Sequence, residues 1–406
     1  MNPPDDRIAA VDPVSAVDAV GPEVSAGTSA RPVWSDGSPM SGPPAWSAGA
    51  TAPDAAPLTP RSITLAASTV VASILLAVAS ILPLPYAVTS PGPTRDPLGQ
   101  QDGRDLIQVQ GAPTYEPTGQ LLLTTVQVAG GPGYPVGLVR VLEGWGRGAD
   151  AVAPVESVFA PSETRDVIDE RNQAAMISSQ ENATVAALEE LGYVVPTTLL
   201  VADAMEGSGA YGVVEPDDVV LSIDGQAVAS FSELSQRMDE VAPGDVVVVG
   251  VQRAGDPIDL EVTTTEGPDG RALLGVLIDP EFDLPIDVRI EIENVGGPSA
   301  GTMFALGIID LLTEQDEANG LTIAGTGTMD LTGRVGPIGG IQQKLAGALE
   351  AGATWFLAPA ANCGEVIGHV PDGLGVVRVA TLSEARAALE AIGAGAGDTL
   401  PTCDDL

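Results

Sequence analysis

Two residues of this 406-residue sequence have the types and settings that nucleophilic chemistry requires. Of the 17 basic residues all but Lys344 are arginine. An arginine keeps its proton in any protein setting, whereas a buried lysine can lose it and act as a base. Ser299 lies in the turn "GGPSAG", residues 296–301. A serine hydroxyl becomes a nucleophile when a base takes its proton, and Ser–Lys pairs are one arrangement that does so.

The sequence around each of these two residues predicts how it is positioned. Residues 286–293 alternate apolar and charged side chains, which predicts a strand, and the apolar run after residue 301 predicts a buried helix. We expect the backbone amides of Gly297 and Ser299, at this helix start, to bind an oxyanion. Lys344 follows "GPIGG" in the first turns of a second helix, where the helix dipole and apolar neighbours lower a lysine pKa. An ordinary serine N-cap and a solvated surface lysine are the alternatives.

Three motifs together resemble the proteolytic domain of Lon-type serine proteases. They are "GPSAG" (297–301), "GTGTMDLTGRVGPIGGIQQK" (325–344) and "AGATWFLAP" (351–359). The sequence is most similar to the membrane-anchored bacterial Lon-like proteases that carry a PDZ domain and no ATPase. The resemblance implies that Ser299 is the nucleophile, that Lys344 is the general base and that Thr326 orients the lysine amine. It also implies self-assembly, with hexameric rings as the family's arrangement.

A β-rich segment, residues 196–282, resembles a PDZ domain. The resemblance rests on "EGSGAYGVVEPDDVVLSIDGQAV", residues 206–228, in which Asp217 stands where the family usually has glycine. PDZ domains capture an extended protein segment by adding it as a strand to a sheet edge. By position, the resemblance implies a peptide-binding groove at Leu199, Leu200, Val201 and Ala202. A spacer domain with an unused edge is the alternative.

The N-terminal part predicts a single membrane anchor. Residues 62–82 carry no charge, and 21 residues of helix are long enough to cross a hydrocarbon core of about 30 Å. A buried globular helix and a cleaved signal peptide are the alternatives. Arg61 at the start of the segment favours a cytoplasmic N-terminus, which places the protease and PDZ segments outside the cytoplasm.

Composition excludes several other classes. A net charge of −38 and a pI near 4.1 disfavour nucleic acid or anionic lipid as a partner. Lys344 follows glutamine, so no Walker A loop is present and no cofactor is expected. Cys363, Cys403 and His369 are too few for a zinc site, so no metal is expected. The cysteines form either a disulfide or two thiols, and a Ser299–His369 triad is a weak alternative to the dyad.

These observations predict an α+β fold in which a Lon-type proteolytic domain contains an inserted PDZ-like domain. The expected parts are a disordered tail (1–60), a transmembrane anchor (61–83), a stalk (84–104), the first part of the protease domain (105–195), the PDZ-like domain (196–282), the part with the dyad (283–395) and a C-terminal tail (396–406). The expected function is ATP-independent endopeptidase action on extended or unfolded proteins. A catalytically inactive, PDZ-centred membrane adaptor or regulator is the alternative.

Overall fold

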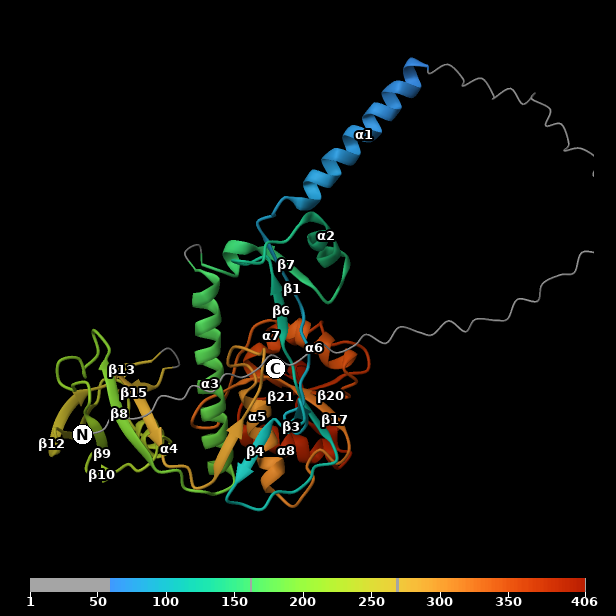
Figure 1. Cartoon of the computed structure of the whole chain (residues 1–406). Helices are drawn as coiled ribbons and strands as arrows, with labels where there is room; N and C mark the ends of the chain where they lie inside the picture. The colour runs from blue at the N-terminus through green and yellow to red at the C-terminus, as the bar shows by residue number, and fades with distance from the viewer. Residues whose placement is uncertain (1–58, 161–162, 268–269, 406) are drawn as a thin grey trace, which may run out of the picture. The chain divides into compact units, whose positions relative to one another are not determined.

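The computed structural model describes residues 59–160, 163–267 and 270–405 (Figure 1). Apart from its last two residues, the predicted disordered tail lies outside the described residues. The chain divides into a unit of residues 1–64 and a unit of residues 65–406. Every helix and strand described belongs to the second unit, except that α1 begins in the first.

Helices and strands are interspersed along the described chain. The helices are α1 (Pro60–Ile81), α2 (Leu138–Gly146), α3 (Arg165–Glu190), α4 (Phe231–Asp239), α5 (Gly301–Leu312), α6 (Ile341–Glu350), α7 (Cys363–Val366) and α8 (Leu382–Gly393). The strands before the PDZ-like segment are β1 (Tyr86–Pro91), β2 (Gln100–Gln101), β3 (Arg104–Asp105), β4 (Ile107–Gln110), β5 (Gln120–Leu123), β6 (Val126–Ala129) and β7 (Ala151–Pro154). Those within it are β8 (Thr197–Ala204), β9 (Val219–Ile223), β10 (Gln226–Ala227), β11 (Val246–Arg253), β12 (Asp256–Thr263), β13 (Thr265–Glu266), β14 (Ala272–Leu273) and β15 (Val276–Phe282). Those after it are β16 (Asp287–Ile290), β17 (Thr322–Gly325), β18 (Thr328–Met329), β19 (Val335–Gly336), β20 (Trp355–Pro359) and β21 (Gly375–Val379).

A four-stranded parallel sheet with the order β21-β20-β17-β5 forms the centre of the second unit. β5 precedes the PDZ-like segment in the chain, whereas its neighbour β17 follows it. β4 and β16 likewise pair across the same segment. The chain therefore leaves this domain, forms the PDZ-like domain and returns. The structure confirms the predicted α+β fold with an insertion.

α5 is the central helix of the core. Ten of its 12 residues are buried, among them Met303, Phe304 and Ile309. A helix that is apolar on all sides is stable only when other elements surround it. Here α3, α8 and β5 contact it, and α3 runs alongside it as one long helix (Figure 1). The rigidity of this packing fixes the start of α5, and Ser299 lies two residues before it.

Residues 119–128 have a pattern typical of one strand, but they form two, β5 and β6. It breaks between β5 and β6, where the Thr124 hydroxyl donates to the Gly325 carbonyl and the Thr125 hydroxyl donates to the Pro93 carbonyl. These side-chain bonds fix the chain at the junction. β6 then joins a separate antiparallel sheet with the order β6-β1-β7, and α2 packs on β1 and β7.

The PDZ-like segment has its own sheet and core. The strand order is β12-β11-β9-β8-β15. Leu199 and Val201 on β8 and Val251 on β11 are fully buried in the core of this domain. Asp217, at the position where the PDZ family usually has glycine, adopts a φ of 69°. That left-handed conformation is one that glycine adopts freely and that aspartate tolerates better than most residues.

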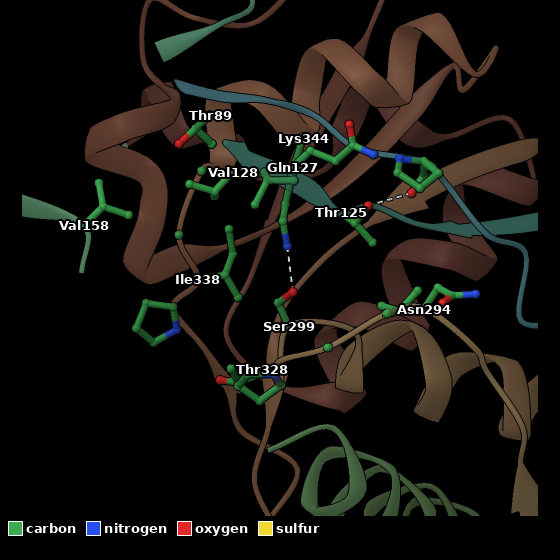
Figure 2. Close-up of a pocket in the computed structure, with 18 residues that line it drawn as sticks. Thr89, Thr125, Gln127, Val128, Val158, Asn294, Ser299, Thr328, Ile338 and Lys344 are labelled. Atoms are coloured by element: carbon green, nitrogen blue, oxygen red, sulfur yellow. Dashed lines mark hydrogen bonds between the residues drawn. The ribbon is translucent and has the colours of Figure 1, made fainter. Parts of the chain in front are cut away.

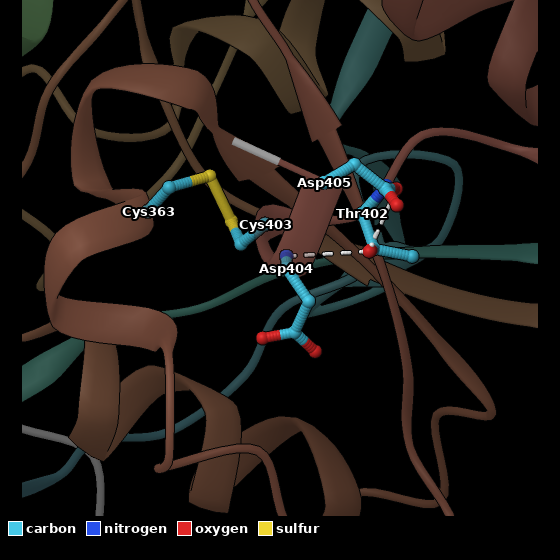
Figure 3. The surroundings of a disulfide bond; sticks show 5 residues. All are labelled: Cys363, Thr402, Cys403, Asp404 and Asp405. Carbon is cyan, nitrogen blue, oxygen red and sulfur yellow. Dashed lines mark hydrogen bonds between the residues drawn. A yellow bond between two sulfur atoms is a disulfide. The ribbon is translucent and has the colours of Figure 1, made fainter.

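A disulfide joins Cys363, at the start of α7, to Cys403 near the end of the chain (Figure 3). The two half-cystines are 40 residues apart in sequence and both are buried. The bond encloses β21 and α8 in a covalent loop. Of the two states left open by the sequence, the structure has the disulfide.

Candidate active site

The structure brings Ser299, Lys344 and Thr326 together. Lys344 Nζ lies 2.8 Å from Ser299 Oγ and 2.8 Å from Thr326 Oγ1. In Figure 2 the lysine side chain points directly at the serine hydroxyl across the cleft. The Thr326 hydroxyl donates its own proton to the Ser299 carbonyl at 2.9 Å, so its oxygen is free to accept from the lysine amine. Each of the three residues is thus hydrogen-bonded to the other two, Ser299 to Thr326 through its main-chain carbonyl.

Burial determines the protonation of Lys344. The residue is only 2% exposed, in the first turns of α6, and no carboxylate pairs with it among the described residues. Desolvation without a counter-charge disfavours the ammonium form and lowers the pKa of Lys344 from 10.5 to about 7. A large share of the amine is therefore neutral at neutral pH, and its lone pair can accept the serine proton.

The turn before Ser299 is held by α3, a contact that sequence reasoning missed. The Gly297 amide donates to the Asn172 carbonyl at 2.8 Å, and the Ser179 hydroxyl donates to the Pro298 carbonyl at 3.0 Å. Gly297 adopts a φ of 84°, which places its amide toward α3. Asn172 and Ser179 lie more than a hundred residues upstream, within a helix whose apolar pattern gives no sign of this contact.

One predicted oxyanion donor is wrong as a result. The Gly297 amide is already bonded to Asn172, so it is not free to bind an oxyanion. The Ser299 amide has no acceptor among the described residues and remains available. The physical reason is that α3 places the Asn172 carbonyl within hydrogen-bond distance of this amide, and a main-chain amide has one proton to donate.

A cleft of about 580 Å³ opens beside Ser299 (Figure 2). Three segments line it: residues 125–128 with β6, residues 294–299 of the nucleophile turn, and residues 337–340 before α6. Among the described residues that line the cleft, Lys344 is the only charged one, and Val128, Val158 and Ile338 contribute apolar surface. β6 is an outer strand of its sheet, so its second edge is unpaired among the described strands.

The sequence-based placement of the PDZ groove at Leu199–Ala202 is also wrong. These residues belong to β8, which pairs with β15 on one side and with β9 on the other, so no strand can add to it. The outer strands of this sheet are β12 and β15, and β15 is the one next to β8. A cavity of about 530 Å³ lies beside β15 and α4, lined by Phe231, Leu234 and Met238 on the helix side, and residues of the proteolytic domain between 330 and 334 also line it.

His369 does not join the site. Its ring lies in an exposed loop, where Nδ1 contacts the Ile367 carbonyl at 3.2 Å, and the residue is not among those that line the cleft. A Ser299–His369 triad is therefore excluded by position.

Residues 284–389 match the sequence profile of the Lon protease (S16) C-terminal proteolytic domain, and residues 178–264 match that of the PDZ domain. The chain therefore carries a Lon-type proteolytic domain together with a PDZ domain. Both motif-based resemblances are confirmed.

Curated relatives match within the same region. The Lon protease of Desulfatibacillum aliphaticivorans is 39% identical over 99 residues, which is 23% of this chain and 12% of that protein. The Lon protease of Clostridioides difficile (strain 630) is 38% identical over 101 residues, 24% of this chain and 12% of that protein. That of Koribacter versatilis is 28% identical over 187 residues, 39% of this chain and 22% of that protein. The matched parts thus span less than a quarter of the relatives' own lengths.

Among solved structures, the crystal structure of the PDZ domain of an SdrC-like protein from Listeria innocua is similar over 20% of this chain and 92% of that chain. The identity is 22% and the TM-score 0.20. A second SdrC-like PDZ domain, from Listeria monocytogenes, is 20% identical over 20% of this chain and 86% of that chain, with a TM-score of 0.19.

Proposed function

We propose that this protein is a membrane-anchored, ATP-independent serine endopeptidase in which Ser299 is the nucleophile and Lys344 the general base. The observation that supports this most directly is the 2.8 Å contact between Ser299 Oγ and a buried lysine amine whose pKa is lowered to about 7. A base is most effective when its pKa lies near the working pH.

The chemistry follows from these contacts. The neutral Lys344 amine takes the Ser299 hydroxyl proton as Oγ bonds to the substrate carbonyl carbon, and the ammonium then gives that proton to the leaving amine. Water then loses a proton to Lys344 as its oxygen bonds to the acyl carbon. The bond between that carbon and Ser299 Oγ breaks, Oγ takes the proton back from the Lys344 ammonium, and both residues return to their starting state. Thr326 positions the amine throughout, and the Ser299 amide donates to the oxyanion.

The cleft supports an extended, uncharged peptide segment as the substrate. The unpaired edge of β6 can bind such a segment as an added strand, which uses main-chain hydrogen bonds and so selects for unfolded protein. Apolar surface from Val128, Val158 and Ile338, with no acidic or arginine side chain among the described lining residues, favours small or apolar side chains next to the cleaved bond.

The cavity beside β15 and α4 is the part of the PDZ domain that we assign to substrate capture. Met238→Glu places a charge in this cavity and is expected to weaken binding of extended substrates while hydrolysis of short peptides is retained. Ile258→Glu, at a partly exposed position of β12 on the far side of the sheet, is the matched control. Equal loss in both variants would contradict the assignment.

Membrane anchoring is supported by α1. Its segment Pro60–Val78 is the one helix among the described residues that is long and apolar enough to cross a bilayer. The Cys363–Cys403 disulfide supports an oxidising compartment for the protease domain, because such bonds persist outside the cytoplasm. Self-assembly into rings, implied by the resemblance to Lon-type proteases, belongs to the same proposal and is tested by light scattering of the protein in detergent.

Ser299→Ala and Lys344→Arg, assayed on casein, test the catalytic proposal. Lys344→Arg keeps the charge and approximate length of the side chain but removes the base. We expect both variants to lose casein hydrolysis. If cleavage persists in both, the protein is an adaptor, and its Lon-type domain serves assembly or binding alone.

A further inference from the structure

α2 exposes an apolar stripe that the proteolytic reaction does not use. Val139 is 55% exposed, Leu142 53% and Trp145 60%. The three residues are spaced i, i+3 and i+6, so they lie along one face of the helix. In a chain with a net charge of −38, three of the five exposed positions of α2 are apolar, and Glu143 is the one charged side chain among them.

The stripe is held rigidly in place. The opposite face of α2 packs on the β6-β1-β7 sheet through Val141 and Gly144. A Cβ atom at Gly144 would lie 2.8 Å from the Val152 side chain and 3.0 Å from that of Val88, so the helix sits as close to the sheet as a backbone can. The Trp145 ring contacts the Tyr86 ring edge-on, with 6.0 Å between centroids. The exposed face is therefore a fixed surface and not a frayed end.

The chain itself ties this surface to the membrane anchor. Leu84, three residues after α1 ends at Ile81, donates its amide to the Val136 carbonyl at 2.9 Å. Val136 precedes α2 by two residues. Three residues of extended chain span at most about 11 Å. Leu84, and through it the segment that leads into α2, therefore lies within about 11 Å of the end of the anchor, whatever direction the anchor takes.

The chemistry of the stripe matches a membrane surface. Tryptophan is enriched at the level of lipid headgroups, and helices with an apolar face and arginines beside it lie in that layer. Arg140 and Arg147 lie on one side of the stripe. Arg140 pairs with Asp150 at 2.8 Å, whereas Arg147 has no ion-pair partner among the described residues. Because the anchor keeps α2 near the bilayer, the local concentration of α2 at the membrane surface is high. A short apolar stripe is therefore sufficient for stable contact with the lipid.

We infer that α2 lies on the bilayer surface through Val139, Leu142 and Trp145, as a second attachment beside the transmembrane helix. This inference rests on the membrane anchoring that belongs to the proposed function. With α2 on the bilayer, the orientation of the cleft relative to the membrane is fixed, because α2 and the cleft strand β6 both pack on β1.

The test uses the full chain in vesicles of phosphatidylcholine and phosphatidylglycerol at three to one. Flotation and resistance to alkaline carbonate first report on α1 alone. Fluorescence is then compared between vesicles with ordinary phosphatidylcholine and vesicles with phosphatidylcholine brominated near the headgroup, because bromine quenches an indole that touches it. The Trp145 signal is the difference in fluorescence emission between the parent protein and Trp145→Phe.

We expect brominated lipid to reduce the Trp145 signal by about twofold or more, as for an indole in the interfacial layer. The double variant Val139→Ser, Leu142→Ser keeps Trp145 as the reporter and is expected to lose that quenching. A control pair, Val194→Ser with Val246→Ser, removes two exposed aliphatic side chains from other elements and is expected to keep it. Melting curves of the variants show that each is folded.

Two results overturn the inference and are distinguishable. If the protein floats and resists carbonate but Trp145 is not quenched, α1 anchors the chain and α2 faces water or a second copy of the chain; blue-shifted, unquenched emission identifies the second copy. If the protein does not float, the anchor fails and the inference fails with it, while the casein assay of Ser299→Ala still decides the peptidase proposal.

Discussion

Replacement of Lys344 by methionine is expected to remove activity and to stabilise the protease domain. Below pH 7 the lysine is charged in both the folded and the unfolded chain, and burial of that charge destabilises the fold. A shift of the pKa from 10.5 to about 7 corresponds to roughly 4 to 5 kcal/mol, at about 1.4 kcal/mol per pKa unit. Methionine fills a similar volume without charge. It loses the contacts to Ser299 and Thr326, which offsets about 1 to 2 kcal/mol. The net gain at pH 7 is then roughly 2 to 4 kcal/mol.

The pH dependence of this gain has a definite sign. The folded pKa lies below the unfolded one, so between pH 7 and 10.5 the unfolded chain holds more protons and the stability of the parent rises with pH. Lys344→Met lacks this proton, so its advantage shrinks by about 2 kcal/mol between pH 7 and pH 9. Guanidinium unfolding of both proteins at pH 7, 8 and 9 measures the difference.

The same pKa governs the rate of the parent enzyme. Its kcat/KM on a fluorogenic peptide is expected to rise tenfold per pH unit below about 7 and then to level off. A midpoint above pH 9, or a Lys344→Met variant that is less stable than the parent at pH 7, would show that burial does not keep this amine neutral.

Three further changes test other parts of the structure. Thr326→Val leaves the lysine amine without its orienting hydroxyl and is expected to lower kcat about 10- to 100-fold, with Thr326→Ser restoring it. Reduction of the Cys363–Cys403 disulfide opens a loop of 40 residues and is expected to destabilise the protease domain by about 4 kcal/mol, which a melting curve with and without dithiothreitol measures. Arg253→Ala removes the partner that holds the pKa of buried Asp218 below its usual value, and the PDZ domain is expected to unfold at a lower denaturant concentration than in the parent. The stabilisation from Asp218 is present at neutral pH and is lost as the pH falls through this lowered pKa, so the difference between Arg253→Ala and the parent disappears in acid.

The sequence predicts the chemistry of this site better than its surroundings. Lys344 is identifiable because its side-chain type is unique in the chain, and Ser299 because a glycine turn joins a strand pattern to an apolar helix. Such signals are local. The packing around the buried helix α5 then fixes where its start lies, and with it the position of Ser299.

The errors arise where a property depends on distant residues. Whether a strand is central or outer depends on the order of strands in the sheet, and both β8 and β15 have patterns typical of a half-buried strand. Likewise, the Gly297 amide is taken by Asn172, whose place beside the turn follows from how α3 packs on α5. The break between β5 and β6 depends on threonine bonds to residues in other segments.

The strand that leaves the anchor is also a strand beside the cleft. β1 is paired on both sides, and Thr89 within it lines the cleft, eight residues after α1 ends. Eight extended residues span at most about 29 Å. On the proposed topology, Thr89 and the cleft beside it therefore lie no more than about 29 Å along the chain from the end of the anchor, so a substrate bond would be cleaved only where it can come that near to the bilayer surface.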